Sequence, residues 1–489
     1  MIVTAGMRTC TAPLSCLAAA VLLILSGCAT APPQSSDAAA VAAAAPALPV
    51  QWASPLPPAP GAAPGAQAPG VSGLGVAELD ALIRAAHAQS PDLAAAVARV
   101  QQADAVARAA GASLLPALHG TLNASRQARA GGQAEVAGNQ MGATLGASYE
   151  LDAWGRLGAE RASAQALRTA SVHDRSAVQI TLTAAVAQAW LQLVGGRERL
   201  AIAELNLQSA ERVLAVVGSR ARAGAATALE LAQQRGLVAT QRQILEARRQ
   251  QVSGAHTALA ALLGQAQLPM VQARELPATQ VLALDAGVPA DLLVRRPDIA
   301  RAEAQLQAAR ADVGAARAAL LPRISLSASL GTGGSGLPRV FDNPLYSLAA
   351  ALAAPIFDGG RLAADRDAAQ ARQAELLAQY RASIVAAVSD VEQSLQAVTS
   401  TQAQRTAQAQ VVQQAQQAAT LAQSRYRAGA ETLLTLLDAQ RTLYAAQDMA
   451  AQLHQAEWLA QVALYRALGG GWQPDADAGV HRVATTARP

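Results

Sequence analysis

Histidine and cysteine are the residues of this sequence with the greatest capacity for chemistry, as general bases, nucleophiles or metal ligands. The six histidines are scattered along the chain, and their spacing does not match that of metal ligands. The neighbouring pair His173-Asp174 is more typical of a solvated helix face than of a catalytic pair. The sequence also contains no nucleophile motif, phosphate-binding loop or cofactor fingerprint. We therefore expect no enzymatic activity, no bound metal and no cofactor.

One cysteine, Cys28, lies in a context that predicts covalent modification. It follows an apolar run, residues 17–25, that is too short to span a bilayer but long enough for a secretory signal peptide. The tetrapeptide Leu25-Ser26-Gly27-Cys28 resembles a bacterial lipobox. This resemblance implies that residues 1–27 are removed and that Cys28 carries S-diacylglycerol and an N-acyl group such as palmitate. Ala29, which stands where Asp would signal retention, implies the outer membrane. An ordinary signal peptide with a chance cysteine is the alternative.

The composition favours long helices over a compact globular core. Of the 489 residues, 52% are hydrophobic, 3% are aromatic and 15% are charged. Much of the apolar fraction is alanine, which favours helix and close helix packing but buries little surface per residue. The formal net charge of +4 comes from arginines interspersed with Asp and Glu, without a basic stripe, so we expect no nucleic-acid binding.

The body of the chain is one unit that occurs twice. The segment Ser90 to Pro116 matches Arg296 to Pro322 without a gap, and Asp92 pairs with Asp298 at a shift of 298 − 92 = 206 residues. We therefore predict two repeats, residues 76–286 and residues 287–471. Before them come a signal peptide, residues 1–27, and then the lipidated Cys28 with a Pro-, Ala- and Gly-rich tether, residues 28–75; a polar tail, residues 472–489, follows them.

Each predicted repeat contains a helix, two strands and a long helical hairpin, in that order. The helix follows a Pro-Asp pair and ends at Leu-Leu-Pro, because proline cannot continue it. The hairpin turns at an Arg-Ala-Gly sequence. Its glycine can adopt a positive φ angle at little energetic cost, because it has no Cβ atom. The strands are expected at residues 117–127 and 140–152 of the first repeat and at residues 321–332 and 345–357 of the second.

Three of the four predicted strands alternate between apolar and polar residues. In the segment Arg323 to Gly331, Ile, Leu and Ala alternate with Ser. The fourth candidate is apolar on both faces over much of its length, so its register is not predicted. An apolar face opposite a Ser, Thr, Asn and Gly face is the pattern of a membrane β-barrel. Four strands cannot close a barrel, whereas three chains would pool about twelve. A small sheet that caps a helical domain in water is the alternative.

Several segments resemble the outer membrane factor (TolC-like) family, and within it the NodT-type efflux lipoproteins. They are GVPADLLVRRPDI and the residues that follow it, within Gly287 to Gly331, PIFDGGR at Pro355 to Arg361, and YRAGAETLLTLLDAQRTLY at Tyr426 to Tyr444. The resemblance covers about Val76 to Gly471. It implies a mainly α fold with a membrane β-barrel portion, in which a homotrimer joins a twelve-stranded barrel to a periplasmic α-helical barrel. The protein would be lipid-anchored and inserted in the outer membrane and would extend into the periplasm.

The same resemblance implies a function and partners. The chain would be the outer-membrane channel of a tripartite efflux system, a passive exit duct for small molecules such as drugs. An inner-membrane RND-type transporter would energise it through a periplasmic adaptor, or membrane fusion, protein, and outer-membrane lipid would surround it. A duct for metal-ion or type I protein export is one alternative. A structural coiled-coil envelope lipoprotein is the other.

The resemblance also implies a gate near the turn of the second hairpin. Tyr426 and Asp438 match the family's pattern at the periplasmic constriction. Glu431 stands where some members have Arg, and Thr435 where some have Asp, so the family's closing network is only partly present. A solvated Asp438 paired with Arg441 on the same helix is the alternative.

Adaptor docking is expected at the Arg-Ala-Gly turns, because they are the exposed features that both hairpins repeat. Ordinary turn chemistry explains the same residues, and the two explanations are compatible. The docking candidates are Arg222 and Gly224 in the first turn and Arg427 and Gly429 in the second.

Overall fold

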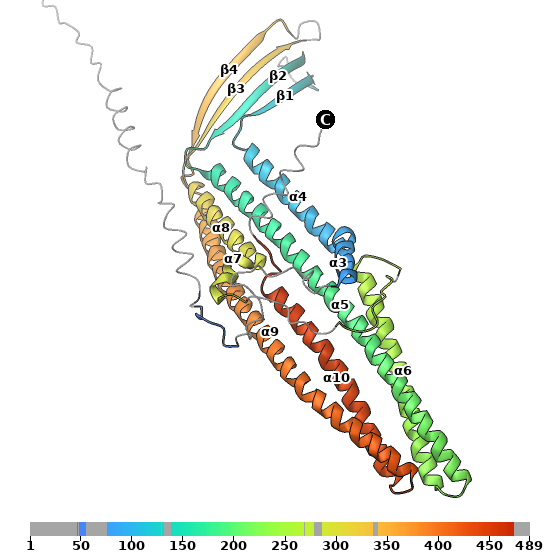
Figure 1. The fold of residues 1–489 in the computed structure, drawn as a ribbon. Helices are drawn as coiled ribbons and strands as arrows, with labels where there is room; N and C mark the ends of the chain where they lie inside the picture. Colours follow the sequence, from blue (N-terminus) through green and yellow to red (C-terminus); the bar gives the residue numbers. More distant parts are fainter. Residues whose placement is uncertain are drawn as a thin grey trace, which may run out of the picture. The chain divides into compact units, whose positions relative to one another are not determined.

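The computed structural model describes residues 46, 48–54, 76–128, 130–131, 138–267, 269–277, 286–335 and 341–473. It divides the chain into two units, Met1–Pro46 and Ala47–Pro489, and all but one of the described residues belong to the second. The predicted signal peptide, Cys28 and the part of the predicted tail beyond residue 473 lie outside the described residues. Within the second unit, long helices carry a single four-stranded antiparallel sheet (Figure 1).

The second unit contains nearly the same series of elements twice. The first series is α3 (Ala77–Gln89), α4 (Pro91–Ala112), β1 (Ala117–Gln127), β2 (Gly138–Leu151), α5 (Arg156–Arg222) and α6 (Ala228–Leu262). The second is a 3₁₀ turn (Pro289–Asp291), α7 (Leu292–Arg295), α8 (Pro297–Ala318), β3 (Arg323–Gly334), β4 (Pro344–Ala353), α9 (Arg361–Arg427) and α10 (Leu433–Ala467). Helices α5 and α9 contain 67 residues each, and α6 and α10 contain 35 each. The predicted duplication is therefore confirmed in the fold.

Local sequence explains where the helices begin and end. Pro91 and Pro297 occupy the first positions of α4 and α8, where a helix leaves the amide without a partner in any case. Thr227 and Glu230 form a capping box at the start of α6, in which each side chain binds the other residue's amide. A 67-residue helix is roughly 100 Å long at about 1.5 Å per residue. The long helices α5 and α9 therefore separate the strands at one end from the hairpin turns at the other (Figure 1).

The sheet has the strand order β1-β2-β3-β4, so β2 and β3 join the two repeats and β1 and β4 form its edges. Paired residues share a face, and the two faces differ in polarity along β1, β2 and β3, whereas β4 has apolar residues on both faces. One row is Gly120, Leu145, Leu330 and Tyr346, and the adjacent row, on the opposite face, is His119, Gly146, Ser329 and Ser347. The Ser329 and Ser347 hydroxyls lie 2.8 Å apart within hydrogen-bond distance. The pairing thus supplies the register of the fourth strand, which the sequence left open.

The prediction for the far end of the fourth strand is wrong. It was expected to reach residue 357, but β4 ends at Ala353. Pro355 explains the early end, because proline has no amide hydrogen to donate to a neighbouring strand. Ile356 and Phe357 consequently lie beyond the strand, where they are 93% and 91% exposed.

Part of the predicted tether contacts the folded body. The indole Nε1 of Trp52 donates a hydrogen bond to the Gly287 carbonyl at 2.9 Å. The amide of Ala53 donates to the Glu392 carboxylate at 3.2 Å. Trp52 and Ala53, which precede the expected start at Val76, therefore already bond to the folded body.

A buried arginine joins the start of α8 to α9 and α10. Arg296 is 9% exposed, and its guanidinium donates to the Asp298 carboxylate at 3.0 and 2.7 Å. It also donates to the Ala467 carbonyl at 3.0 Å and lies 3.4 Å from an Asp390 oxygen. This network gives the Arg296-Pro297-Asp298 sequence a structural role.

Candidate gate and docking surface

The two hairpins end in turns of the same conformation. Gly224, between α5 and α6, has a φ angle of 74°, and Gly429, between α9 and α10, has one of 76°. Both angles lie in the left-handed region that side chains with a Cβ atom rarely adopt. The docking candidates Arg222 and Arg427 are exposed beside these glycines. The structure thus places Arg222 beside Gly224 at the tip of the first hairpin and Arg427 beside Gly429 at the tip of the second.

Sequence reasoning missed an exposed leucine next to each turn. Leu229, the second residue of α6, is 66% exposed, and Leu434, the second residue of α10, is 65% exposed. The two leucines are related by the repeat, since 434 − 229 = 205, the same shift as between the turn glycines Gly224 and Gly429. This correspondence in the sequence could have identified them. Each tip therefore presents an arginine and a leucine to its surroundings, a combination suited to packing against another helical hairpin.

Near the tips, the two hairpins share one apolar core. Its buried side chains come from all four helices and include Val217 of α5, Leu237 of α6, Ala419 of α9 and Leu433 of α10. Separating the hairpins would return this surface to water at a cost of about 25 cal/mol for each Å². The packing of the two hairpins is therefore stabilised by burial as well as by polar contacts.

Tyr426, the first gate candidate, lies inside this core with 3% of its surface exposed. Burial and the nearby Glu230 carboxylate raise the pKa of its hydroxyl, and the positive charge of Arg220 opposes them in part. The hydroxyl oxygen has no hydrogen-bond partner among the described residues. Tyr426 thus belongs to the contact between the two hairpins.

Arg220 of α5 is a contact residue that sequence reasoning missed. Its Nη1 atom donates a hydrogen bond to the Tyr426 carbonyl at 2.5 Å. Its guanidinium carbon lies 4.7 Å from the centre of the Tyr426 ring, in a cation–π contact. The two residues come from different repeats, so the only sequence signal was an arginine close to the first turn. Arg220 therefore supplies a cation at the tip from the first hairpin.

The remaining gate candidates fall into two places. The Thr435 hydroxyl donates to the Glu431 carboxylate at 3.1 Å, and Arg425 lies 4.0 Å from that carboxylate. Asp438 is exposed, and no cation of the described residues lies within 4.0 Å of its carboxylate. The suggested ion pair between Asp438 and Arg441 is therefore not formed. The structure brings Glu431 and Thr435 together and leaves Asp438 apart.

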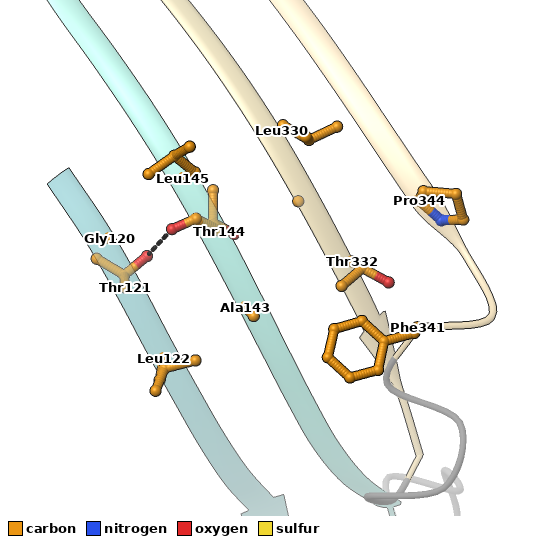
Figure 2. Close-up of a pocket in the computed structure, with 11 residues that line it drawn as sticks. Gly120, Thr121, Leu122, Ala143, Thr144, Leu145, Leu330, Thr332, Phe341 and Pro344 are labelled. Carbon is orange, nitrogen blue, oxygen red and sulfur yellow. Dashed lines mark hydrogen bonds between the residues drawn. The ribbon is translucent and has the colours of Figure 1, made fainter. Parts of the chain in front are cut away.

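The sheet bears a broad hollow of about 550 Å³, which Figure 2 shows across the four strands. Leu122, Leu145 and Leu330 line it together with Phe341, so its walls are largely apolar. The Thr121 hydroxyl donates to the Thr144 carbonyl within it, at 3.4 Å. Apolar side chains remain exposed here, including Leu122 at 89%, which is unusual for a surface in water.

The profile of the outer membrane efflux protein family matches this chain twice, over residues 82–265 and 288–470. The chain belongs to the outer membrane efflux protein family. This efflux protein is 50% identical over 412 residues to the pyoverdine export outer membrane protein OpmQ of Pseudomonas aeruginosa, covering 82% of the chain and 87% of that relative. It is 32% identical over 399 residues to the cation efflux system protein CusC of Escherichia coli, covering 81% of the chain and 86% of CusC.

Solved structures agree with this assignment. The outer-membrane channel OprN superimposes on the efflux protein with a TM-score of 0.80 at 27% identity, covering 88% of the chain and 99% of OprN. The protein is therefore the outer-membrane component of an efflux system and extends from that membrane into the periplasm. This assignment sets aside the alternative of a purely structural envelope lipoprotein.

Proposed function

We propose that three copies of this chain form a passive exit duct for small organic molecules. Their sheets would close a twelve-stranded barrel, and their hairpins would continue it through the periplasm. An inner-membrane RND-type transporter would energise export through a periplasmic adaptor. The separation of the sheet into an apolar and a polar face, with two unpaired edge strands, is the observation that carries this proposal.

The two sheet edges support pooling of strands between copies. In lipid, each unpaired backbone group costs several kcal/mol, so an open sheet cannot remain there. Pairing of β1 from one copy with β4 of the next would satisfy both edges and close the barrel. The row that contains Leu145 and Leu330 would then face lipid, and the row that contains Ser329 and Ser347 would face the lumen.

The names of the relatives indicate which class of molecule this chain exports. OpmQ, whose name refers to pyoverdine export, shares 50% identity with this chain, whereas CusC, whose name refers to cation efflux, shares 32%. We therefore favour small organic molecules such as drugs as cargo. Metal-ion export and type I protein export stay alternatives.

The proposed gate is the contact between the two hairpins at the tip. Arg220 and Tyr426 would hold α9 against α5 in the closed duct. Exposed Asp438 would form a ring of three carboxylates around the pore under threefold symmetry, while Glu431 and Thr435 would fix the start of α10. Opening would then require the hairpins to move apart, because the contact between Arg220 and Tyr426 joins two different helices.

The turns around Gly224 and Gly429 are the proposed adaptor-docking surface. Site-specific photo-crosslinking from Ala430 in living cells, followed by mass spectrometry, is expected to capture a periplasmic adaptor encoded with an RND-type transporter. Ala430 is exposed and makes no side-chain hydrogen bond, so its replacement should leave the turn intact. The same probe at exposed Gln402, far along α9 from the turn, serves as the control. An adaptor of a protein-secretion system would instead support the alternative duct, and stable channels without an adduct would contradict docking at this turn.

A lipid anchor at Cys28 is also proposed. Cys28→Ala is expected to abolish incorporation of radiolabelled palmitate into the protein, because the variant lacks the thiol that the lipid would modify. Assembly should persist, since the strands and the hairpins are formed by other residues. Retained palmitate label in the variant would refute the lipobox assignment.

A further inference from the structure

A cavity of about 320 Å³ lies between the first hairpin and α10, away from the gate contacts. Its lining comes from α5, α6 and α10. Asp448, one of the lining residues, is the sixteenth residue of α10, which places it roughly 22 Å from the start of that helix. We call this space the inter-hairpin cavity.

The inter-hairpin cavity carries more positive than negative charge. The Asp448 carboxylate accepts hydrogen bonds from Arg199 at 2.9 and 3.0 Å and from Arg248 at 3.1 and 3.0 Å. A third arginine of the lining, Arg441, has no carboxylate within 4.0 Å among the described residues. Asp448 is the only acidic residue of the lining, so three guanidinium groups face one carboxylate.

Two buried amides in the lining lack partners. Asn206 of α5 is 7% exposed and Gln241 of α6 is 6% exposed. Neither side chain forms a hydrogen bond to another described residue. Both amides line the cavity, where water or a ligand can supply a partner. Their N–H groups can donate to such a ligand.

We propose that the inter-hairpin cavity binds a small oxyanion of the size of sulfate or a carboxylate. Arg441 would supply the countercharge, and the amides of Asn206 and Gln241 would donate hydrogen bonds to the anion. Arginine suits this role because its planar group binds two oxygen atoms at once. A cation is disfavoured by the net positive charge, and an apolar ligand would leave both amides unsatisfied.

The bound anion would tie α10 to the first hairpin. Arg199 and Arg248 already hold α10 through Asp448, and the anion would add a second connection through Arg441. Anion binding would therefore stabilise the packed hairpins by mass action. This inference concerns the single chain and does not depend on the identity of the exported cargo.

Isothermal titration calorimetry with sodium sulfate, at constant ionic strength, tests the proposal on the purified full-length protein. Saturable binding is expected in the wild type, and Arg441→Gln is expected to weaken it at least tenfold. Gln241→Leu, which removes one donor and leaves every arginine in place, should weaken it as well. The matched control is Arg249→Gln on α6, because exposed Arg249 pairs with Glu246 and does not line the cavity.

The outcomes distinguish a specific anion-binding site in the cavity from non-specific electrostatic attraction of anions. Loss of affinity in both cavity variants, with the Arg249 control within twofold of the wild type, supports the proposal. Equal weakening in all three variants would indicate non-specific charge attraction and overturn it. Absence of saturable binding in the wild type would show that the cavity holds only water or a neighbouring side chain, which also overturns it. Circular dichroism melts show whether each variant is folded.

Discussion

Arg296→Ala is expected to lower the free energy of unfolding by about 3–5 kcal/mol, the usual cost of removing one partner of a buried ion pair. The substitution leaves Asp298 and Asp390 without their shared cation and the Ala467 carbonyl without its donor. It also disconnects the start of α8 from α9 and α10. Urea unfolding of the purified protein, followed by circular dichroism, measures the loss.

Arg295→Ala is the matched control for this prediction. Arg295 is the preceding residue, its side chain is 41% exposed, and it pairs with Asp291 at 3.3 Å one helical turn away. Exposed pairs of this kind contribute about 0–1 kcal/mol. A similar loss in the two variants would contradict a special role for Arg296 and would indicate a general sensitivity of this corner.

The same network predicts how stability depends on pH. Burial alone would raise the pKa of the Asp298 carboxyl, but the hydrogen bond and charge of Arg296 outweigh it and hold that pKa below its ordinary value of 3.8. The folded state therefore binds this proton less readily than the unfolded state. The contribution is fully present above pH 3.8 and is lost as the pH falls through the lower folded pKa. Acid titration should show a smaller loss in Arg296→Ala than in the wild type.

Arg220→Ala is expected to make the closed channel leak. A cation–π contact contributes about 0.5–2 kcal/mol, and a hydrogen bond from a charged donor about 1.5–3 kcal/mol. A net loss of about 2 kcal/mol per chain would shift the balance between closed and open tips by roughly 30-fold. Conductance of the purified channel in planar bilayers measures this shift without an adaptor.

Two variants make the leakage result specific. Arg222→Ala removes an exposed arginine two residues away that bonds only to Ser219 among the described residues, at 3.2 Å, and it should leave the closed conductance unchanged. Asp438→Ala should alter ion selectivity more than closed-state leakage, because Asp438 joins no contact between the hairpins. If Arg220→Ala conducts like the wild type, the proposal that the contact between Arg220 and Tyr426 keeps the channel closed is wrong.

Local patterns in the sequence determined the strands and the repeat. The alternation of Leu118 and Gly120 with His119 and Thr121 has the period of a strand, and this segment lies within β1. Helix ends followed from Pro116 and from the turn glycines, because their backbone preferences act within a few residues. The family resemblance added what the periodicity could not, namely a membrane channel.

Contacts between distant segments were decided by the tertiary structure alone. Arg220 meets Tyr426 across a separation of 206 residues, and Arg199 meets Asp448 across 249. Neither arginine differs locally from the many other arginines of the helices. Partner choice depends on how the two hairpins pack, and that packing arises from burial summed over whole helices.

The end of the fourth strand and the docking of Trp52 differ in whether the sequence could have predicted them. Pro355 was visible in the sequence, and its missing amide hydrogen could have ended the predicted strand correctly at Ala353. The hydrogen bond from Trp52 to Gly287 could not have been foreseen, because it joins a proline-rich segment to a carbonyl 235 residues away. Periodicity in sequence reports the local conformation of a chain, whereas its long-range partners are set only when the helices assemble.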